Sequence, residues 1–93
     1  MSPNRAADLP EGIAELKSTT AQALRMAVTS DRRAWYEIER IVREYVRALR
    51  GHGMKSERAV AETKALVVQA TGDPLSSLLT SAVTWALSEY YER

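Results

Sequence analysis

The chain has 93 residues, with 13 lysines and arginines against 12 aspartates and glutamates, which gives a formal net charge of +1. The absence of cysteine excludes disulfides, thiol nucleophiles and cysteine-based zinc sites. A single histidine cannot form a histidine-rich metal site. A chain of this length buries only about two-thirds of its unfolded surface. Composition therefore favours one compact domain that gains from sharing an interface.

No segment shows the period-two alternation of a strand, so the predicted fold is all-α. Residues 1–7 are expected to form a flexible tail and residues 8–93 a single domain. The domain should be a compact bundle of about four helices, completed by dimerisation, at approximately 9–28, 31–50, 57–70 and 74–91. Asp8 is a candidate cap for the first of these. Ser18, Thr19 and Thr20 have low helix propensity, so this helix is expected to be short, bent or ordered only by packing.

The second predicted helix begins at Ser30 and Asp31, which supply a capping oxygen and a negative charge. It ends at Gly51, His52 and Gly53, because glycine tolerates the conformation that closes a helix. Its apolar positions recur every three or four residues, the spacing of one helix face: Trp35, Ile38, Val42, Tyr45 and Leu49.

Arginines gather beside that apolar face, although the chain as a whole is nearly neutral. We call them the arginine stripe: Arg32, Arg33, Arg40, Arg43, Arg47 and Arg50. Glu39 and Glu44 stand at pairing distance from Arg43 and Arg47 along the helix. The stripe is open to three interpretations, namely a solvated face, a site for an acidic protein partner, or a site for nucleic-acid phosphates.

Ser56 is predicted to cap the third helix, and Asp73 with Pro74 to start the fourth. No charged residue occurs between Asp73 and Glu89. A surface helix normally carries charge opposite its apolar stripe, so this helix is either enclosed by its own fold or half-covered by a second subunit. The second interpretation predicts a self-association surface at Leu78, Trp85, Leu87 and Tyr91.

Little in the sequence suggests catalysis. His52 lies in a predicted exposed turn, and no serine, aspartate or glutamate stands at a spacing that indicates a catalytic proton relay with it. No phosphate-binding loop, nucleophile elbow or metal-ligand motif is present. We expect no enzyme activity, no cofactor and no bound metal. The chain also lacks a secretory signal or a sufficiently long apolar run, which predicts a cytoplasmic protein without a membrane partner.

Two resemblances add to this interpretation. The first rests on residues 45–50, Gly53, 57–59, 64–67 and 83–87, followed by Tyr90 and Tyr91. These segments are similar to short helical proteins of uncharacterised function from GC-rich soil bacteria, and the resemblance implies no activity. The layout around Gly53, Ser56 and Ala59 resembles ANTAR RNA-binding domains. The basic, asparagine-containing signature of that family is missing, so no RNA-contact residue carries over.

These observations predict a small non-enzymatic interaction or regulatory module. It would form a homodimer through the fourth helix and bind an acidic protein partner through the arginine stripe. One alternative is a transcriptional regulator that binds nucleic acid through the stripe. Another is a structural subunit of a larger assembly, because a charge-free helix in so small a chain suggests an incomplete unit.

Overall fold

The computed structural model describes residues 11–28, 35–73 and 76–91. These form no strand and four α-helices, which confirms the predicted fold class: α1 (Glu11–Ala27), α2 (Trp35–Gly51), α3 (Ser56–Thr71) and α4 (Ser77–Tyr91). The expected tail at residues 1–7 and the proposed helix starts at Asp8 and at Ser30 and Asp31 lie outside the described residues.

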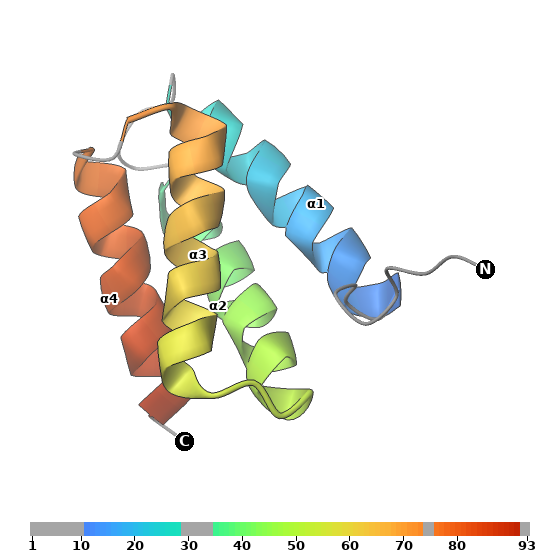
Figure 1. Ribbon diagram of the computed structural model, residues 1–93. Helices are drawn as coiled ribbons and strands as arrows, with labels where there is room; N and C mark the ends of the chain where they lie inside the picture. Colours follow the sequence, from blue (N-terminus) through green and yellow to red (C-terminus); the bar gives the residue numbers. More distant parts are fainter. Residues whose placement is uncertain (1–10, 29–34, 74–75, 92–93) are drawn as a thin grey trace.

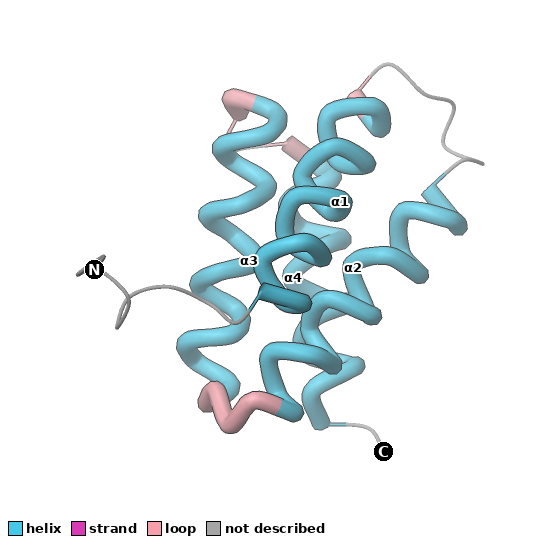
Figure 2. The backbone as a smooth tube through the Cα atoms, turned by 90° about the vertical axis from the view of Figure 1, so that its right-hand side faces the viewer, coloured by secondary structure: helices cyan, strands magenta, loops and turns pink. Residues whose placement is uncertain are grey.

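The helices form a small bundle with α2 and α3 between the other two. Both α1 and α4 pack on α2 and α3. Figure 1 shows α3 beside α4, while α1 runs at an angle and diverges from α3 toward its own start. Figure 2 shows the short turn that joins α2 to α3. None of the described helices is long and apolar enough to cross a bilayer.

The core is built from the apolar faces that helical periodicity predicts. On α2 the buried residues are Ile38, Val42, Tyr45, Val46 and Leu49. Full burial of a large aliphatic side chain stabilises a fold by about 1.5–3 kcal/mol, so α2 contributes most to the core. The buried residues of α4 are Leu78, Ala82 and Ala86. The two alanines are small and allow the α4 backbone to approach the other helices closely.

Helix α1 is continuous from Glu11 to Ala27, although its serine and threonine run predicts a helix that is short, bent or ordered only by packing. Thr20 is 1% exposed and lies in the core beside Leu24. Its hydroxyl donates a hydrogen bond of 2.6 Å to the carbonyl oxygen of Leu16, one turn earlier. The polar group is thereby satisfied within the helix, so burial outweighs the low helix propensity of threonine.

Two glycines lie in the turns that follow α2 and α3, where the sequence predicts that these helices end. Gly53 has φ of 96° and Gly72 has φ of 73°, conformations that other residues rarely adopt. The Gly72 N–H donates a hydrogen bond of 2.7 Å to the Val68 carbonyl oxygen, and α3 ends there. His52 is exposed in the turn after α2, as the sequence predicts.

The predicted cap of α3 is wrong. The N-cap position belongs to Lys55, whose carbonyl accepts the first helical hydrogen bond, from the Ala59 N–H at 2.8 Å. Ser56 is already helical, and its hydroxyl oxygen accepts a hydrogen bond of 2.6 Å from the Tyr91 hydroxyl. A partner on a distant helix has replaced the local capping interaction.

The start of α4 also differs from the predicted cap at Asp73, because the helix begins at Ser77. The predicted first helical residue, Pro74, lies outside the described residues. Ser76 is the cap, since its hydroxyl oxygen accepts a hydrogen bond of 3.1 Å from the Leu79 N–H. We expect Ser76→Ala to lower the free energy of unfolding by about 1 kcal/mol. Urea denaturation followed by circular dichroism measures this, and Ser77→Ala, at the exposed first position of the helix, is the matched control. Equal losses in both variants would contradict the capping role.

Candidate interaction surfaces

The described arginines of the stripe all have partners within the molecule. Arg40 forms an ion pair with Glu37 on the same helix. Arg43 Nε lies 2.8 Å from Glu39 Oε2, which confirms that predicted pair. Arg32 and Arg33 lie outside the described residues.

Glu89 on α4 joins two arginines of α2. Its Oε1 lies 3.4 Å from Arg43 Nη1 and its Oε2 lies 3.0 Å from Arg47 Nε. Arg47 therefore pairs with a residue of α4, whereas the sequence predicted Glu44, on the same helix as Arg47, as its partner. Burial alone raises the pKa of Glu89, but the hydrogen bonds and charges of Arg47 and Arg43 outweigh burial and hold this pKa below its ordinary value.

The two tyrosines after Glu89 extend this connection. Tyr90 donates a hydrogen bond to the carbonyl oxygen of Met54 in the turn between α2 and α3. The guanidinium carbon of Arg50 lies 5.6 Å from the centre of the Tyr90 ring, within the range of a cation–π interaction. The end of α4 is thus attached to α2, to the following turn and, through Tyr91, to α3.

These contacts change the interpretation of the arginine stripe. Along α2 its described members contact α4 or pair along their own helix, so each already has a partner within the chain, although the Arg40 and Arg47 side chains are 62% and 66% exposed. Sequence reasoning missed this because Glu89 lies 42 residues after Arg47. The only available signal was that Glu89 ends the charge-free stretch of the last helix.

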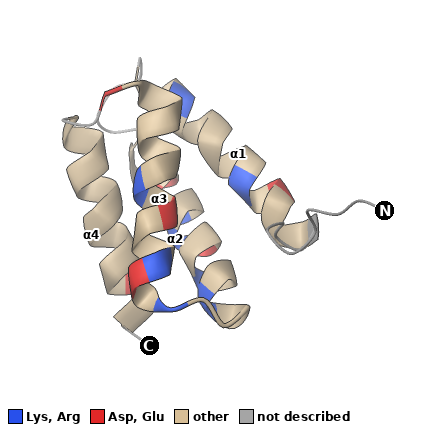
Figure 3. Ribbon diagram, in the orientation of Figure 1, with Lys and Arg blue, Asp and Glu red and all other residues tan. Residues whose placement is uncertain are grey.

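The outward face of α4 carries no charge. Figure 3 shows α4 in the uncharged colour over most of its length, whereas the other helices carry blue and red segments. The exposed residues recur every three or four positions and so form one stripe, which we call the α4 face: Ser77, Thr80, Thr84, Leu87 and Tyr91.

The four residues predicted for self-association do not all reach this face. Leu87 is 42% exposed and Tyr91 is 66% exposed, and both belong to it. Trp85 is partly buried against the core and lies at the side of the helix. Leu78 is only 4% exposed, because it points into the bundle. Leu78 is therefore a core residue, and assigning it to a self-association surface was wrong.

A hollow that the sequence analysis did not single out lies between α1 and α3. Its volume is about 310 Å³, and Lys17 and Arg25 are its charged lining residues. The two cations are eight positions apart on α1, but a sequence alone does not show that α3 completes the second wall. The contact between α1 and α3 had to be known first.

In the described part of the chain, no set of three or more histidine, cysteine, aspartate or glutamate side chains is placed to hold a metal ion. Burial, with a smaller effect from the charge of Glu62, raises the pKa of Tyr45 to about 12. This hydroxyl is enclosed in the core and does not line any of the described hollows.

Comparison of the chain with family models, curated proteins and solved structures gives no significant match. Function must therefore be argued from the surfaces themselves.

Proposed function

We propose that this protein is a non-enzymatic interaction module that forms a homodimer through the α4 face. The observation that carries the proposal is the combination of exposure and absent charge on this one helix. Every residue from Ser77 to Ser88 is uncharged, yet several of them are solvent-exposed. Depletion of charged residues, with aromatic residues present, is typical of the centre of protein interfaces.

The spacing of the α4 face suits pairing with a second helix of the same kind. Intervals of three and four residues match the repeat with which side chains of paired helices interlock. At 1.5 Å per residue, the 15 residues of α4 extend about 22 Å. Two copies related by a two-fold axis would place the same face of each α4 against the other.

The composition of the face varies along its length. Ser77, Thr80 and Thr84 are small and allow close approach at the start of the helix, whereas Leu87 and Tyr91 supply larger apolar area near its end. Tyr91 is held in place by its hydrogen bond to Ser56. A restrained aromatic side chain loses less conformational entropy on binding, which favours a role in the contact.

The arginine stripe adds less support to partner binding than its charge suggests. Arg43 and Arg47 would have to exchange their contacts with Glu89 for contacts with an acidic partner or with phosphate. An exchange of one ion pair for another yields little net free energy. We therefore place the primary interaction surface on α4 and not on α2.

Sedimentation equilibrium over a wide concentration range tests the dimer. We expect a dimer mass for the native chain and a monomer mass for Leu87→Glu, because two copies of an uncompensated charge would meet at the interface. Ala61→Glu, which adds the same charge at an exposed position of α3, is the matched control and should remain dimeric. A monomer at all concentrations, or equal weakening by both substitutions, would contradict the proposal.

A further inference from the structure

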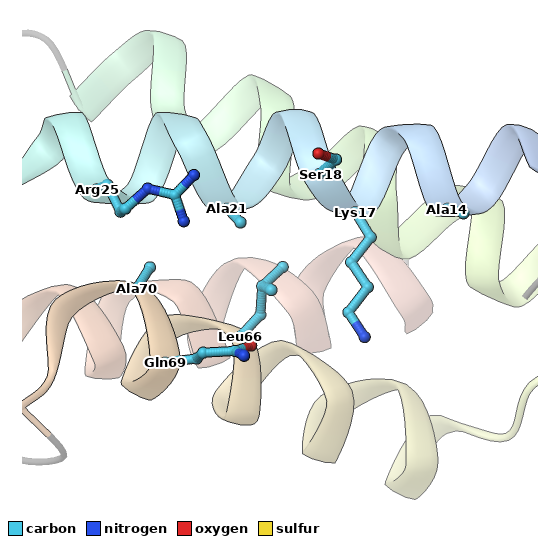
Figure 4. A pocket seen from close by; sticks show the side chains of 8 residues that line it. All are labelled: Ala14, Lys17, Ser18, Ala21, Arg25, Leu66, Gln69 and Ala70. Carbon is cyan, nitrogen blue, oxygen red and sulfur yellow. The ribbon is translucent and has the colours of Figure 1, made fainter. Parts of the chain in front are cut away.

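The hollow between α1 and α3 has a distinctive lining (Figure 4). From α1 come five residues, Ala14, Lys17, Ser18, Ala21 and Arg25. From α3 come Leu66, Gln69 and Ala70. We call this surface the α1–α3 groove. Its lining contains two cations and no acidic residue, in a protein whose overall charge is close to zero.

Among the described residues, the cations of the groove differ from the arginines of the stripe because no ion pair engages them. Arg43 and Arg47 both form ion pairs with Glu89, and Arg43 also pairs with Glu39. Within the described residues, by contrast, neither Lys17 nor Arg25 forms an ion pair. Figure 4 shows the Lys17 side chain extending toward α3 and the Arg25 guanidinium lying over the groove near Ala21. Two cations without an ion pair among the described residues therefore line the same concave surface.

The walls of the groove are low because the side chains that form them are small. Ala14, Ser18 and Ala21 follow one another at intervals of four and three residues, so they line a single strip of α1. Leu66, which is 3% exposed, and Ala70 provide an apolar floor on α3. An incoming helix could therefore seat an apolar side chain between α1 and α3, with its backbone close to α1.

The two cations stand at a separation that suits a helical occupant. Lys17 and Arg25 are eight residues apart on one helix, which corresponds to about 12 Å at 1.5 Å per residue. Carboxylates about two turns apart on a second helix, lying alongside α1, would come opposite both of them. Arginine pairs with a carboxylate through its forked donors, and lysine does so as a point charge.

We propose that the α1–α3 groove binds an acidic amphipathic helix of a partner protein. Apolar side chains of that helix would pack on Leu66, Ala21 and Ala70, and its carboxylates would pair with Lys17 and Arg25. The proposal goes beyond self-association, because the groove lies between α1 and α3 whereas the dimer surface is the outward face of α4. Either surface can therefore be tested without the other.

The probe is a fluorescein-labelled helical peptide with leucines on one face and flanking glutamates two turns apart, followed by fluorescence anisotropy at low and physiological salt. We expect the full chain to bind it, and the double variant Lys17→Glu with Arg25→Glu to weaken binding by at least about tenfold. The matched control replaces Lys55 and Lys64, two exposed lysines outside the groove, by glutamate. It changes the net charge equally and should leave affinity within about twofold.

A second variant separates shape from charge. Ser18→Leu fills the groove at an exposed position and keeps both cations, so it should also weaken binding clearly. Unaltered sedimentation and circular dichroism of all variants would show that fold and dimer are intact. The proposal is overturned if the native chain does not bind the peptide, if both charge variants weaken it equally, or if Ser18→Leu has no effect. A short DNA duplex that outcompetes the peptide would also overturn it, in favour of nucleic acid.

Discussion

Replacing Tyr45 by alanine is expected to lower the free energy of unfolding by about 3 kcal/mol. Tyr45 is 0% exposed and is the largest fully buried side chain of the core. Truncation of a buried aromatic ring costs about 3–5 kcal/mol, through lost burial and the cavity left behind. A domain of this size has a total stability of about 5–15 kcal/mol, so the variant would be marginal.

Removal of only the Tyr45 hydroxyl should not destabilise the fold, in contrast to removal of the whole ring. Within the described residues, its oxygen is buried without a hydrogen-bond partner, and an unsatisfied buried polar group costs about 1–3 kcal/mol. Tyr45→Phe is therefore expected to be neutral or to stabilise the fold by about 1 kcal/mol. Tyr36, which is 83% exposed on the same helix, supplies the matched control. Tyr36→Ala should change stability by less than about 0.5 kcal/mol.

Alkaline pH gives an independent measure of this burial. The pKa of Tyr45 is raised from 10.0 to about 12, first by burial and then by the charge of Glu62. Above pH 10 the phenol of the unfolded chain ionises while the folded one stays neutral, so stability is retained below pH 10 and is lost as pH rises toward 12. Urea denaturation at several pH values should show a shallower alkaline loss for Tyr45→Phe than for the native chain. Identical pH profiles would show that burial does not raise the pKa of this hydroxyl. A clear loss of stability in Tyr45→Phe would show that the hydroxyl has a stabilising partner.

The fold could be predicted because its determinants are local. The apolar periodicity that places Ile38, Val42 and Leu49 on one face of α2 is visible in the sequence, and all three are buried. The cap of α3 could not be predicted in the same way. Ser56 has the right chemistry for a local cap, but its hydroxyl accepts from Tyr91, 35 residues later. A choice between local and distant partners depends on packing that only the folded chain defines.

The candidate surfaces also combine features that are visible in the local sequence with features that depend on how the helices pack. The uncharged stretch of α4 is a local property, so exposed Leu87 and Tyr91 could be anticipated, whereas the inward direction of Leu78 depends on the angle at which α4 packs. The arginine stripe was recognised as a cluster, but its partner Glu89 comes from another helix. The α1–α3 groove requires two helices to be brought together before Lys17 and Arg25 face a common hollow.

The second large effect is expected at Glu89, whose carboxylate is shared by Arg43 and Arg47. Its side chain is 18% exposed and that of Arg43 is 26% exposed, so these charges are only partly screened by water. Glu89→Gln removes the negative charge while keeping the shape, and should lower the free energy of unfolding by about 1–2 kcal/mol. The loss stays moderate because Arg43 retains Glu39. Urea denaturation at neutral pH measures it.

Acid titration separates this interaction from simple loss of packing. Because the folded pKa of Glu89 lies below its ordinary value of 4.5, its contribution is present above that pH and is lost as pH falls through the folded pKa. The native chain and Glu89→Gln should therefore converge in stability at acid pH. Glu37→Gln is the control, because among the described residues Glu37 forms its ion pair with exposed Arg40, and this pair should matter little. If Glu89→Gln and Glu37→Gln behaved alike, the stripe would be a solvated face, and its arginines would again be available to an external partner.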